Sequence, residues 1–243
     1  MADRRRTAGR TTVVLVHGGW HDETCWDPLR EELDARGIPS TAVRLPMTRL
    51  DADADVVRTA IEAQDGDVIV VAHSWGGSPA TLGASGLPRV KHLVYLAAFM
   101  IEAGVPVTPP ARRRPTAGGA AKAGADGTVA IDASLARQAF YDDVSDGLAD
   151  RMIATLRPMA AASFEPVATD RAAAWRTVPS TYAVCLRDRA IHPEDQRAMA
   201  GDAGEVVEFD TGHSPFLSRP DLVADLIADR YDRLRRGNAA PAS

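Results

Sequence analysis

Short apolar runs of strand length alternate along this chain with segments of helical periodicity. Residues 12–16 and 67–72 are mostly apolar, whereas Val57, Ala60 and Ile61 recur at helical spacing. Strands that are apolar on both faces are typical of a parallel sheet covered by helices on both sides. The pattern predicts strands at 12–16, 41–45, 67–72, 90–97, 181–186 and 205–209, with helices at 56–63, 76–85, 194–199 and 220–234 and one more helix that ends near Gly37. We therefore expect an α/β fold with a mostly parallel, doubly wound sheet of about six strands.

One long segment interrupts this alternation between the fourth and fifth predicted strands. Residues 103–130 are rich in Pro, Gly, Ala and Arg and lack periodicity, which predicts a long mobile loop. Residues 133–162 look helical. The expected organisation is an α/β core at 12–100 and 176–235, a small helical lid insertion at 101–175, and flexible ends at 1–11 and 236–243.

The composition is that of an ordinary globular protein and narrows the range of partners. The chain has 243 residues, of which 45% are hydrophobic and 25% charged, and its formal net charge is -5. An acidic chain with only short basic runs does not favour binding to nucleic acid, and no apolar run approaches the roughly 18 residues of a membrane span. Two cysteines, Cys25 and Cys185, make a disulfide framework unexpected and fit a reducing cytoplasm. We expect a cytoplasmic protein that acts on a small molecule; a homodimer is compatible with the sequence, which does not decide the oligomeric state.

The segment Val68–Gly77, with the sequence VIVVAHSWGG, places a serine at a sharp turn between a buried strand and a helix. This is the setting of a nucleophile elbow, in which a strained turn exposes the serine oxygen at the edge of a sheet. Ala72 and Gly76 stand two positions before and after Ser74 and are small, although alanine replaces the usual first glycine. The plainer alternative is a helix-capping serine. The context favours Ser74 as the nucleophile.

A serine nucleophile needs a general base, and the base needs an acceptor that orients it. His213 follows the predicted strand 205–209, and Asp188 follows the predicted strand 181–186. Both would therefore lie at the carboxyl edge of the sheet, where Ser74 must lie. Asp188 could instead be a turn residue and His213 a loop histidine. The chain order Ser74, Asp188, His213 predicts a catalytic triad.

A glycine loop directly after the first strand supplies candidate donors for an oxyanion. The backbone N–H groups of Gly19 and of Trp75, the residue after the serine, would point at the oxygen that becomes negative during acyl transfer. A tight turn is the plain alternative for these glycines. We expect Gly19 and Trp75 to form an oxyanion hole.

Several short motifs together indicate a family. They are His17–His21 (HGGWH) with Trp26, His73–Gly77 (HSWGG), Leu96–Met100 (LAAFM), Phe140–Asp143 (FYDD), Leu156–Pro158 (LRP), Asp188–Glu194 (DRAIHPE) and Gly212–Ser214 (GHS). Apart from residues 105–130, the chain resembles the α/β-hydrolase fold superfamily, and within it the plant-type methylesterase and hydroxynitrile lyase family. The resemblance implies an esterase mechanism with Ser74 as nucleophile.

Two positions separate the branches of that family. Its lyases carry a threonine after the first histidine of the early loop and a lysine directly after the catalytic histidine. This chain has Gly18 and Ser214 at those positions. Cyanohydrin cleavage is therefore disfavoured, and we expect the esterase branch.

Aromatic and histidine side chains near the predicted loops are candidates for the substrate pocket, although some could be ordinary core residues. They are Trp20, His21, Phe99, Phe140, Tyr141 and Phe216. Asp51, Asp53 and Asp55 alternate before a helix, but helix N-termini attract acidic residues and no His or Cys accompanies them. We expect no metal and no cofactor.

These residues predict a cofactor-free serine hydrolase that cleaves a carboxylic ester of a small to medium hydrophobic substrate through an acyl-enzyme. One alternative is a biosynthetic tailoring enzyme, such as a thioesterase, lactonase, cyclase or lyase, that uses the same triad. Another is a non-catalytic ligand receptor on the hydrolase scaffold. The acyl and alcohol groups of the substrate depend on the insertion, which the sequence does not describe.

Overall fold

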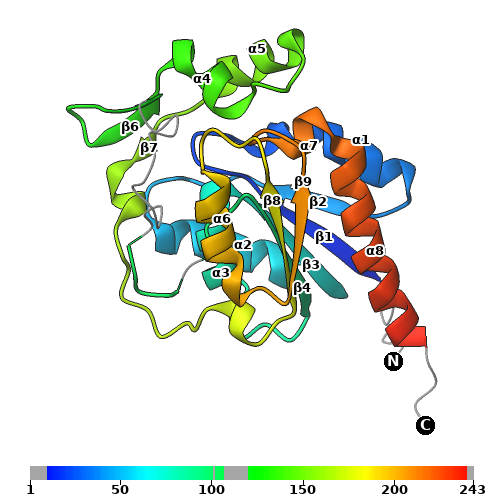
Figure 1. Cartoon of the computed structure of the whole chain (residues 1–243). Coiled ribbons are helices and arrows are strands. Elements are labelled where there is room, and N and C mark those ends of the chain that lie inside the picture. Colours follow the sequence, from blue (N-terminus) through cyan, green and yellow to red (C-terminus); the bar gives the residue numbers. More distant parts are fainter. Residues whose placement is uncertain (1–9, 101, 107–119, 240–243) are drawn as a thin grey trace.

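A six-stranded parallel sheet forms the centre of the molecule (Figure 1). The structure, a computed structural model, describes residues 10–100, 102–106 and 120–239. The strands lie in the order β2-β1-β3-β4-β8-β9, and each neighbouring pair is parallel. They are β1 (Thr11–Val16), β2 (Ser40–Val43), β3 (Asp67–His73), β4 (Val90–Leu96), β8 (Ser180–Cys185) and β9 (Glu205–Phe209). The predicted sheet is confirmed, and each observed strand overlaps its predicted range.

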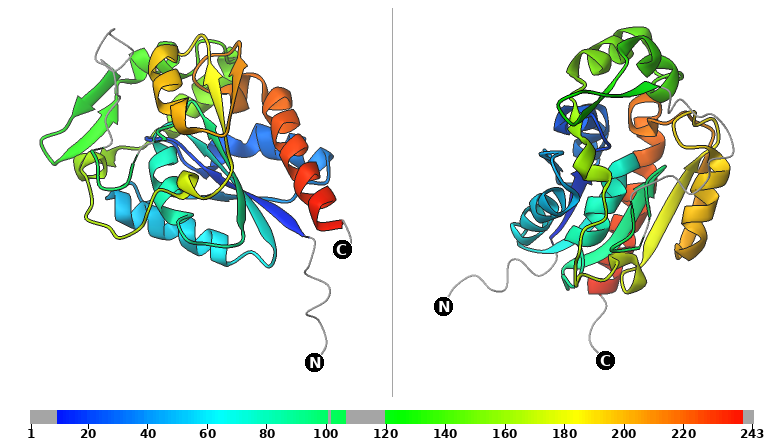
Figure 2. Two further views of the ribbon diagram at one scale, coloured as in Figure 1. Left: turned by 60° about the horizontal axis from the view of Figure 1, so that its bottom comes forward. Right: turned by 90° about the vertical axis from the view of Figure 1, so that its left-hand side faces the viewer.

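Helices cover both faces of this sheet, as the two views of Figure 2 show. Successive side chains of β1 point to opposite faces of the sheet. Val13 and Leu15 pack in the apolar cluster under α1 (Asp27–Ala35) and α8 (Pro220–Ala239), whereas Val14 and Val16 pack in the apolar cluster under α2 (Leu50–Glu62) and α3 (Gly77–Gly83). All four side chains are fully buried. The helices of the core are α1 (Asp27–Ala35), α2 (Leu50–Glu62), α3 (Gly77–Gly83), α6 (Pro193–Met199), α7 (Pro215–Ser218) and α8 (Pro220–Ala239).

The segment between β4 and β8, called here the inserted segment, carries α4, α5 and β6 over one end of the sheet, and its later part runs along the side of the core toward the other end (Figure 1). Its described part contains a small antiparallel sheet of β5 (Ala121–Ala123), β6 (Thr128–Ile131) and β7 (Met159–Ala160), and the helices α4 (Ala133–Phe140) and α5 (Asp146–Thr155). The loop predicted at 103–130 was therefore wrong where β5 and β6 form; its residues 107–119 lie outside the described residues. The helical reading of 133–162 was wrong at the break between α4 and α5 and beyond Thr155. Pairing of β6 with the distant β7 is a tertiary effect that local periodicity does not report.

The predicted flexible ends need two corrections. Thr11 is buried in β1 rather than part of a loose N-terminus. At the other end α8 continues to Ala239, so residues 236–239 are helical although the apolar face ends at Leu234. Backbone hydrogen bonds carry a helix past its last core contact, which a hydrophobic pattern cannot show. Of both predicted ends, residues 1–9 and 240–243 lie outside the described residues.

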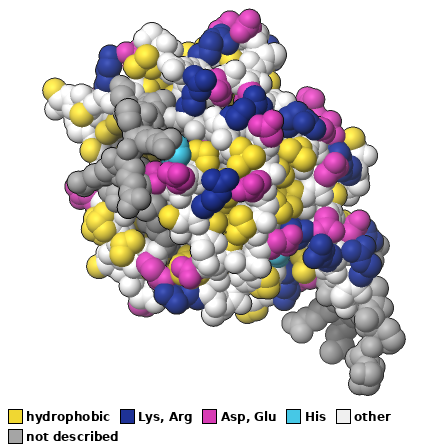
Figure 3. All heavy atoms as spheres, in the orientation of Figure 1, with side chains coloured by type: hydrophobic (Ala, Val, Ile, Leu, Met, Phe, Trp, Pro, Cys, Tyr) yellow, Lys and Arg dark blue, Asp and Glu magenta, His cyan; other side chains and the backbone are white. Residues whose placement is uncertain are grey.

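The surface seen in Figure 3 mixes acidic and basic side chains without a broad patch of one sign. Many of these charges pair, as in Arg36 with Asp225 and Arg197 with Glu208. Within the described ranges, no helix combines the length and the apolar character needed to cross a bilayer. Both cysteines are free thiols in the core, and burial raises the pKa of each, so neither is poised as a thiolate.

Asp53 is buried at the start of α2, and its charge makes stability depend on pH. Its Oδ1 accepts from the Met47 N–H at 2.8 Å, whereas its Oδ2 has no hydrogen-bond partner among the described residues. Burial raises the pKa of Asp53 to about 7, partly offset by the Met47 N–H and by Arg157. Between about pH 4 and pH 7 the folded state therefore still holds a proton on Asp53, whereas the unfolded state, with its ordinary pKa of 3.8, has already released it. The free energy of unfolding should fall as pH rises through this window.

We expect Asp53→Asn to remove this dependence, because the amide oxygen still accepts from Met47 and cannot ionise. Relative to the parent chain, the variant should gain about 2 kcal/mol of stability between pH 5 and pH 8. Urea unfolding of both proteins at the two pH values measures the difference. An equal difference at both would mean that Asp53 does not titrate in this range.

Candidate active site

Ser74 lies at the point where the strand order reverses. From β1 the chain first adds β2 on one side and then crosses to β3 on the other, which is where ligands bind in open α/β sheets. Ser74 opens a 3-10 turn between β3 and α3 and has φ +52°, a strained value for a residue with a side chain. Glycines make the turn fit: a Cβ on Gly77 would stand 2.5 Å from the Phe99 carbonyl oxygen, and one on Gly76 would overlap the His17 carbonyl. The predicted elbow geometry is present.

The three predicted triad residues lie in one hydrogen-bonded series. The distance from His213 Nε2 to Ser74 Oγ is 3.1 Å, and that from His213 Nδ1 to Asp188 Oδ2 is 2.7 Å. All three residues are buried. Because a carboxylate accepts from Nδ1–H, the Nε2 lone pair of a neutral imidazole faces the serine hydroxyl. This arrangement allows His213 to take the proton of Ser74.

Asp188 is held by three further donors that the sequence did not indicate. Its Oδ1 accepts from the backbone N–H groups of Ala190 and Ile191, at 2.7 and 2.8 Å. Its Oδ2 accepts from the Gln196 amide at 2.8 Å as well as from His213. The Gln196 side chain is itself fixed by the Cys185 N–H and the Ile191 carbonyl. Gln196 lies on the predicted helix 194–199 and is fully buried. Burial cannot be read from one sequence, so the sequence did not mark Gln196 as a support of Asp188.

The glycine loop after β1 lies beside the residue that follows the serine. A Cβ built on Gly19 would stand 3.6 Å from the Cβ of Trp75. His17 Nδ1 donates to the Gly18 carbonyl at 2.8 Å, and the Leu45 N–H donates to His17 Nε2 at 3.1 Å. Because the Gly18 carbonyl and the Gly19 N–H belong to one peptide plane, His17 also orients that N–H. Burial lowers the pKa of His17 to about 3, so it keeps this neutral form near pH 7.

His73, directly before the elbow, ties the histidine loop to it. Its Nε2–H donates to the backbone carbonyl of His213 at 2.9 Å, and the two rings are 4.6 Å apart. Burial, with His213 nearby, lowers the pKa of His73 well below its ordinary value. A neutral His73 therefore fixes the main chain that carries His213.

The six predicted pocket residues fall into different settings. The Phe140 ring lies 5.5 Å from the His213 ring and 6.1 Å from Trp20, whose other neighbour is Phe164. His21 and Tyr141 are buried and hydrogen-bonded to each other, and the Phe99 N–H donates to the Ser74 carbonyl. Phe216 is fully buried and packs against the rings of Trp26 and His73, so it supports the site from the core.

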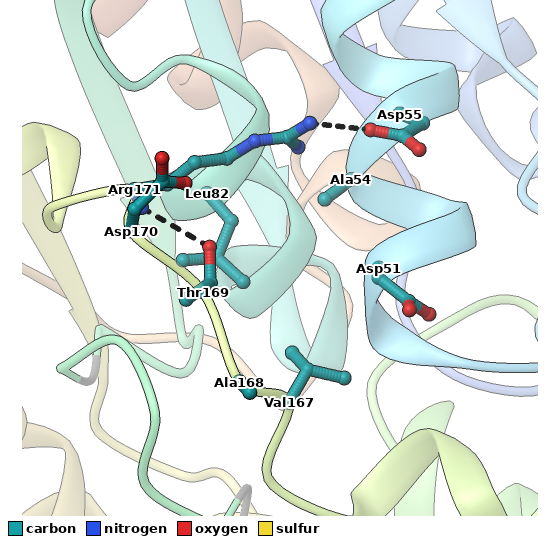
Figure 4. Close-up of a pocket in the computed structure, with 9 residues that line it drawn as sticks. All are labelled: Asp51, Ala54, Asp55, Leu82, Val167, Ala168, Thr169, Asp170 and Arg171. Carbon is teal, nitrogen blue, oxygen red and sulfur yellow. Dashed lines mark hydrogen bonds and ion pairs between the residues drawn. The ribbon is translucent and has the colours of Figure 1, made fainter.

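A separate surface pocket of about 410 Å³ lies between α2, α3 and residues 167–171 (Figure 4). Asp51 and Asp55 line it, and Asp55 pairs with Arg171 at 2.6 Å, whereas Asp53 turns inward to Met47. Asp51, Asp53 and Asp55 therefore do not converge. In the part of the chain that the structure describes, no group of three or more His, Cys, Asp or Glu side chains is arranged to hold a metal ion.

A parallel sheet with a strained serine elbow after β3 and histidine and aspartate loops after its last strands defines the α/β-hydrolases. The sequence profile of the Alpha/beta hydrolase family matches residues 13–226, and the chain belongs to this family. Within it the chain is methylesterase-like, as its sequence motifs predict.

Individual relatives match the chain over most of its length. It is 31% identical over 245 residues to "Probable hydrolase R7" of a Phoma species, covering 89% of this chain and 96% of the relative. It is 28% identical over 250 residues to Methylesterase 7 of Arabidopsis thaliana, covering 90% and 96%. The crystal structure of a pyrethroid hydrolase from Sphingobium faniae JZ-2 has a TM-score of 0.77 at 24% identity, covering 91% of this chain and 98% of that one. This last likeness shows a shared fold.

Proposed function

We propose that this chain is a serine esterase that hydrolyses a carboxylic ester through an acyl-enzyme and needs no cofactor. The observation that carries the proposal is the buried series from Ser74 Oγ through His213 to Asp188, with Ser74 held in the strained elbow conformation. A serine hydroxyl is a weak nucleophile on its own, and such a series is what activates it.

The chemistry follows from these positions. Ser74 Oγ attacks the ester carbonyl while His213 Nε2 takes its proton, and the N–H groups of Gly19 and Trp75 hydrogen-bond to the resulting oxyanion. Collapse of this intermediate expels the alcohol, which takes the proton from His213. Water, deprotonated by His213, then attacks the acyl-Ser74, and collapse of this second intermediate releases the acid while His213 returns the proton to Ser74 Oγ. Asp188 holds the Nδ1–H of His213 throughout.

The surroundings of the site favour an apolar substrate. Trp20, Phe140 and Phe164 form a run of aromatic rings that reaches the His213 ring. Met159 lies beside the glycine loop, with its sulfur 3.1 Å from a Cβ built on Gly19. The names of the relatives, methylesterases and pyrethroid hydrolases, support an ester substrate. A small or medium hydrophobic acyl or alcohol group fits these walls.

A panel of esters tests the proposal. Methyl esters with acyl groups of increasing apolar size, aryl acetates, a thioester and a lactone are incubated with the protein, and the acid and alcohol products are quantified. Ser74→Ala serves as the blank. We expect turnover of several carboxylic esters with equal amounts of acid and alcohol. Turnover of only the thioester or lactone would assign the site to a tailoring enzyme, and saturable binding without any turnover would replace the esterase by a receptor.

A further inference from the structure

Four consecutive residues of the inserted segment, Phe140–Asp143, contact the loops that carry the candidate catalytic groups. They follow the body of α4 and lead into α5, which Figure 1 shows over the end of the sheet. These residues, called here the bridging segment, are separated from Ser74 by the whole of β4 and much of the insertion. Their contacts are therefore made by the fold and not by neighbours in sequence.

Toward the histidine loop, the bridging segment makes a ring contact and a hydrogen bond. Phe140 packs 5.5 Å from the His213 ring. The Gly212 N–H, one residue before His213, donates to Asp143 Oδ2 at 2.6 Å. A Cβ on Gly212 would stand 2.8 Å from Asp143 Oδ1 and would overlap the Asp142 carboxyl, so a side chain at this position would displace both carboxyl groups. Asp143 therefore holds the main chain at Gly212, and the position of Gly212 determines where His213 lies.

Toward the glycine loop, the bridging segment acts through one histidine. His21 Nδ1 donates to the Gly19 carbonyl at 2.7 Å, so His21 Nε2 must accept, and the Tyr141 hydroxyl donates to it at 2.7 Å. Tyr141 is fully buried, and burial lowers the pKa of His21 to about 4, which keeps the ring neutral. The Tyr141 hydroxyl thus fixes the tautomer with which His21 holds the Gly19–Trp20 peptide, which directly follows the Gly19 N–H in the glycine loop.

Toward the aspartate loop, the contacts are ion pairs at the surface. Arg189, next to Asp188, pairs with Asp142 at 3.2 Å, and Arg187 lies 3.7 Å from Asp143. Both arginine side chains are 55% exposed and line an open groove of about 700 Å³. Exposed pairs of this kind contribute little by themselves, so the buried contacts of Tyr141 and Asp143 carry the larger effect.

We propose that Tyr141 and Asp143 are positioning residues that hold the glycine loop, which carries the Gly19 N–H, and His213 in place together, so that the site is competent only when the bridging segment is seated. This inference rests on the proposed esterase function. Neither side chain needs to touch the substrate; each acts through a residue of the reacting site.

Two pairs of variants test the proposal in the full chain. Asp143→Ala removes the acceptor of the Gly212 N–H, whereas Asp143→Asn keeps an acceptor oxygen. We expect kcat for a methyl ester to fall about tenfold or more in Asp143→Ala, with KM within about threefold of the parent, and to recover to within about threefold in Asp143→Asn. Arg137→Ala is the matched control, because Arg137 pairs with Asp146 and Asp150 inside the insertion and should leave kcat unchanged.

Tyr141→Phe removes one oxygen atom and tests the other contact. If Tyr141, through His21, holds the glycine loop that carries the Gly19 N–H, the variant should lose more activity on an ester than on the matching thionoester, because sulfur accepts hydrogen bonds from the oxyanion donors poorly. The ester-to-thionoester ratio of kcat/KM should therefore drop several-fold, which general loosening of the fold would not cause. Thermal unfolding of each variant establishes that it is folded, and if Asp143→Ala is not, Tyr141→Phe decides alone.

The outcomes separate this inference from the proposed function. A parent chain that hydrolyses no ester would refute the esterase proposal itself. A parent chain that is active and depends on Ser74, with an unchanged kcat in Asp143→Ala and an unchanged ratio in Tyr141→Phe, would overturn the positioning role and leave the esterase proposal standing.

Discussion

Replacing Ser74 with alanine is expected to lower kcat for ester hydrolysis by about 10⁶-fold, the order of loss seen when a triad nucleophile is removed. The reason is that the acyl-enzyme forms on Ser74 Oγ, which His213 Nε2 faces at 3.1 Å. Steady-state kinetics with the best ester of the panel measures the loss. The remaining rate should come from the oxyanion donors and substrate binding alone.

Ser78→Ala is the matched control for this experiment. Ser78 is a buried serine in α3, one turn beyond Ser74, and its Oγ has no hydrogen-bond partner among the described residues. Its removal should leave kcat within about twofold, since neither a polar contact nor the elbow depends on it. A Ser74→Ala protein that keeps a tenth or more of the parent activity would exclude Ser74 as the nucleophile.

Asp188→Asn is expected to lower kcat by about 10⁴-fold, the size of the effect of the same change in another serine hydrolase. All four groups that bond to the Asp188 carboxyl are donors: two backbone N–H groups, the Gln196 amide and His213. An asparagine has only one acceptor oxygen. With the Ala190 and Ile191 N–H groups on that oxygen, its NH₂ faces the Gln196 amide and His213 Nδ1. The imidazole then adopts the tautomer that carries its proton on Nε2, which cannot accept the proton of Ser74.

The control for Asp188 is Asp210→Asn in the histidine loop. Asp210 is 80% exposed and pairs with the half-exposed Arg187, so its loss should change kcat little. Both variants are assayed for kcat and for thermal unfolding. An Asp188→Asn protein that is folded and loses less than about tenfold would contradict the orienting role of Asp188.

The sheet and the three triad candidates could be predicted because their signals are local. Buried parallel strands are continuous apolar runs, and a serine, an aspartate and a histidine that directly follow such runs must meet at one edge of the sheet. The structure does bring Ser74, Asp188 and His213 together. A Gly-Gly pair after β1 is likewise visible in the sequence and stands beside Trp75.

The inserted segment could not be predicted in the same way, because long-range contacts determine it. β6 pairs with β7, which lies far along the chain. Trp20, in the glycine loop of the core, donates to the carbonyl of Val129 in β6. The hairpin turn at Gly127, with φ +78°, lies in a glycine-rich stretch whose composition resembles that of a mobile loop.

The residues that hold the triad candidates were missed for a related reason. Gln196 and Asp143 are polar residues whose partners come from other loops, and a single sequence shows neither burial nor partner. The sequence FYDD at Phe140–Asp143 indicated the family, but not a structural role for Asp143. The contact of Asp143 with Gly212 depends on how the insertion packs on the core. Supporting contacts of this kind become visible only in three dimensions.

Fluorophosphonate labelling with peptide mapping by mass spectrometry tests most directly whether Ser74 is an activated nucleophile. The serine oxygen attacks phosphorus, fluoride leaves, and the proton passes to His213, so the reagent uses the same groups as the ester. We predict one phosphonyl adduct per chain, on the peptide that contains Ser74, and loss of esterase activity in proportion to labelling. An active protein that carries no adduct on Ser74, or that keeps its activity when Ser74 is fully labelled, would contradict the serine esterase proposed for this chain.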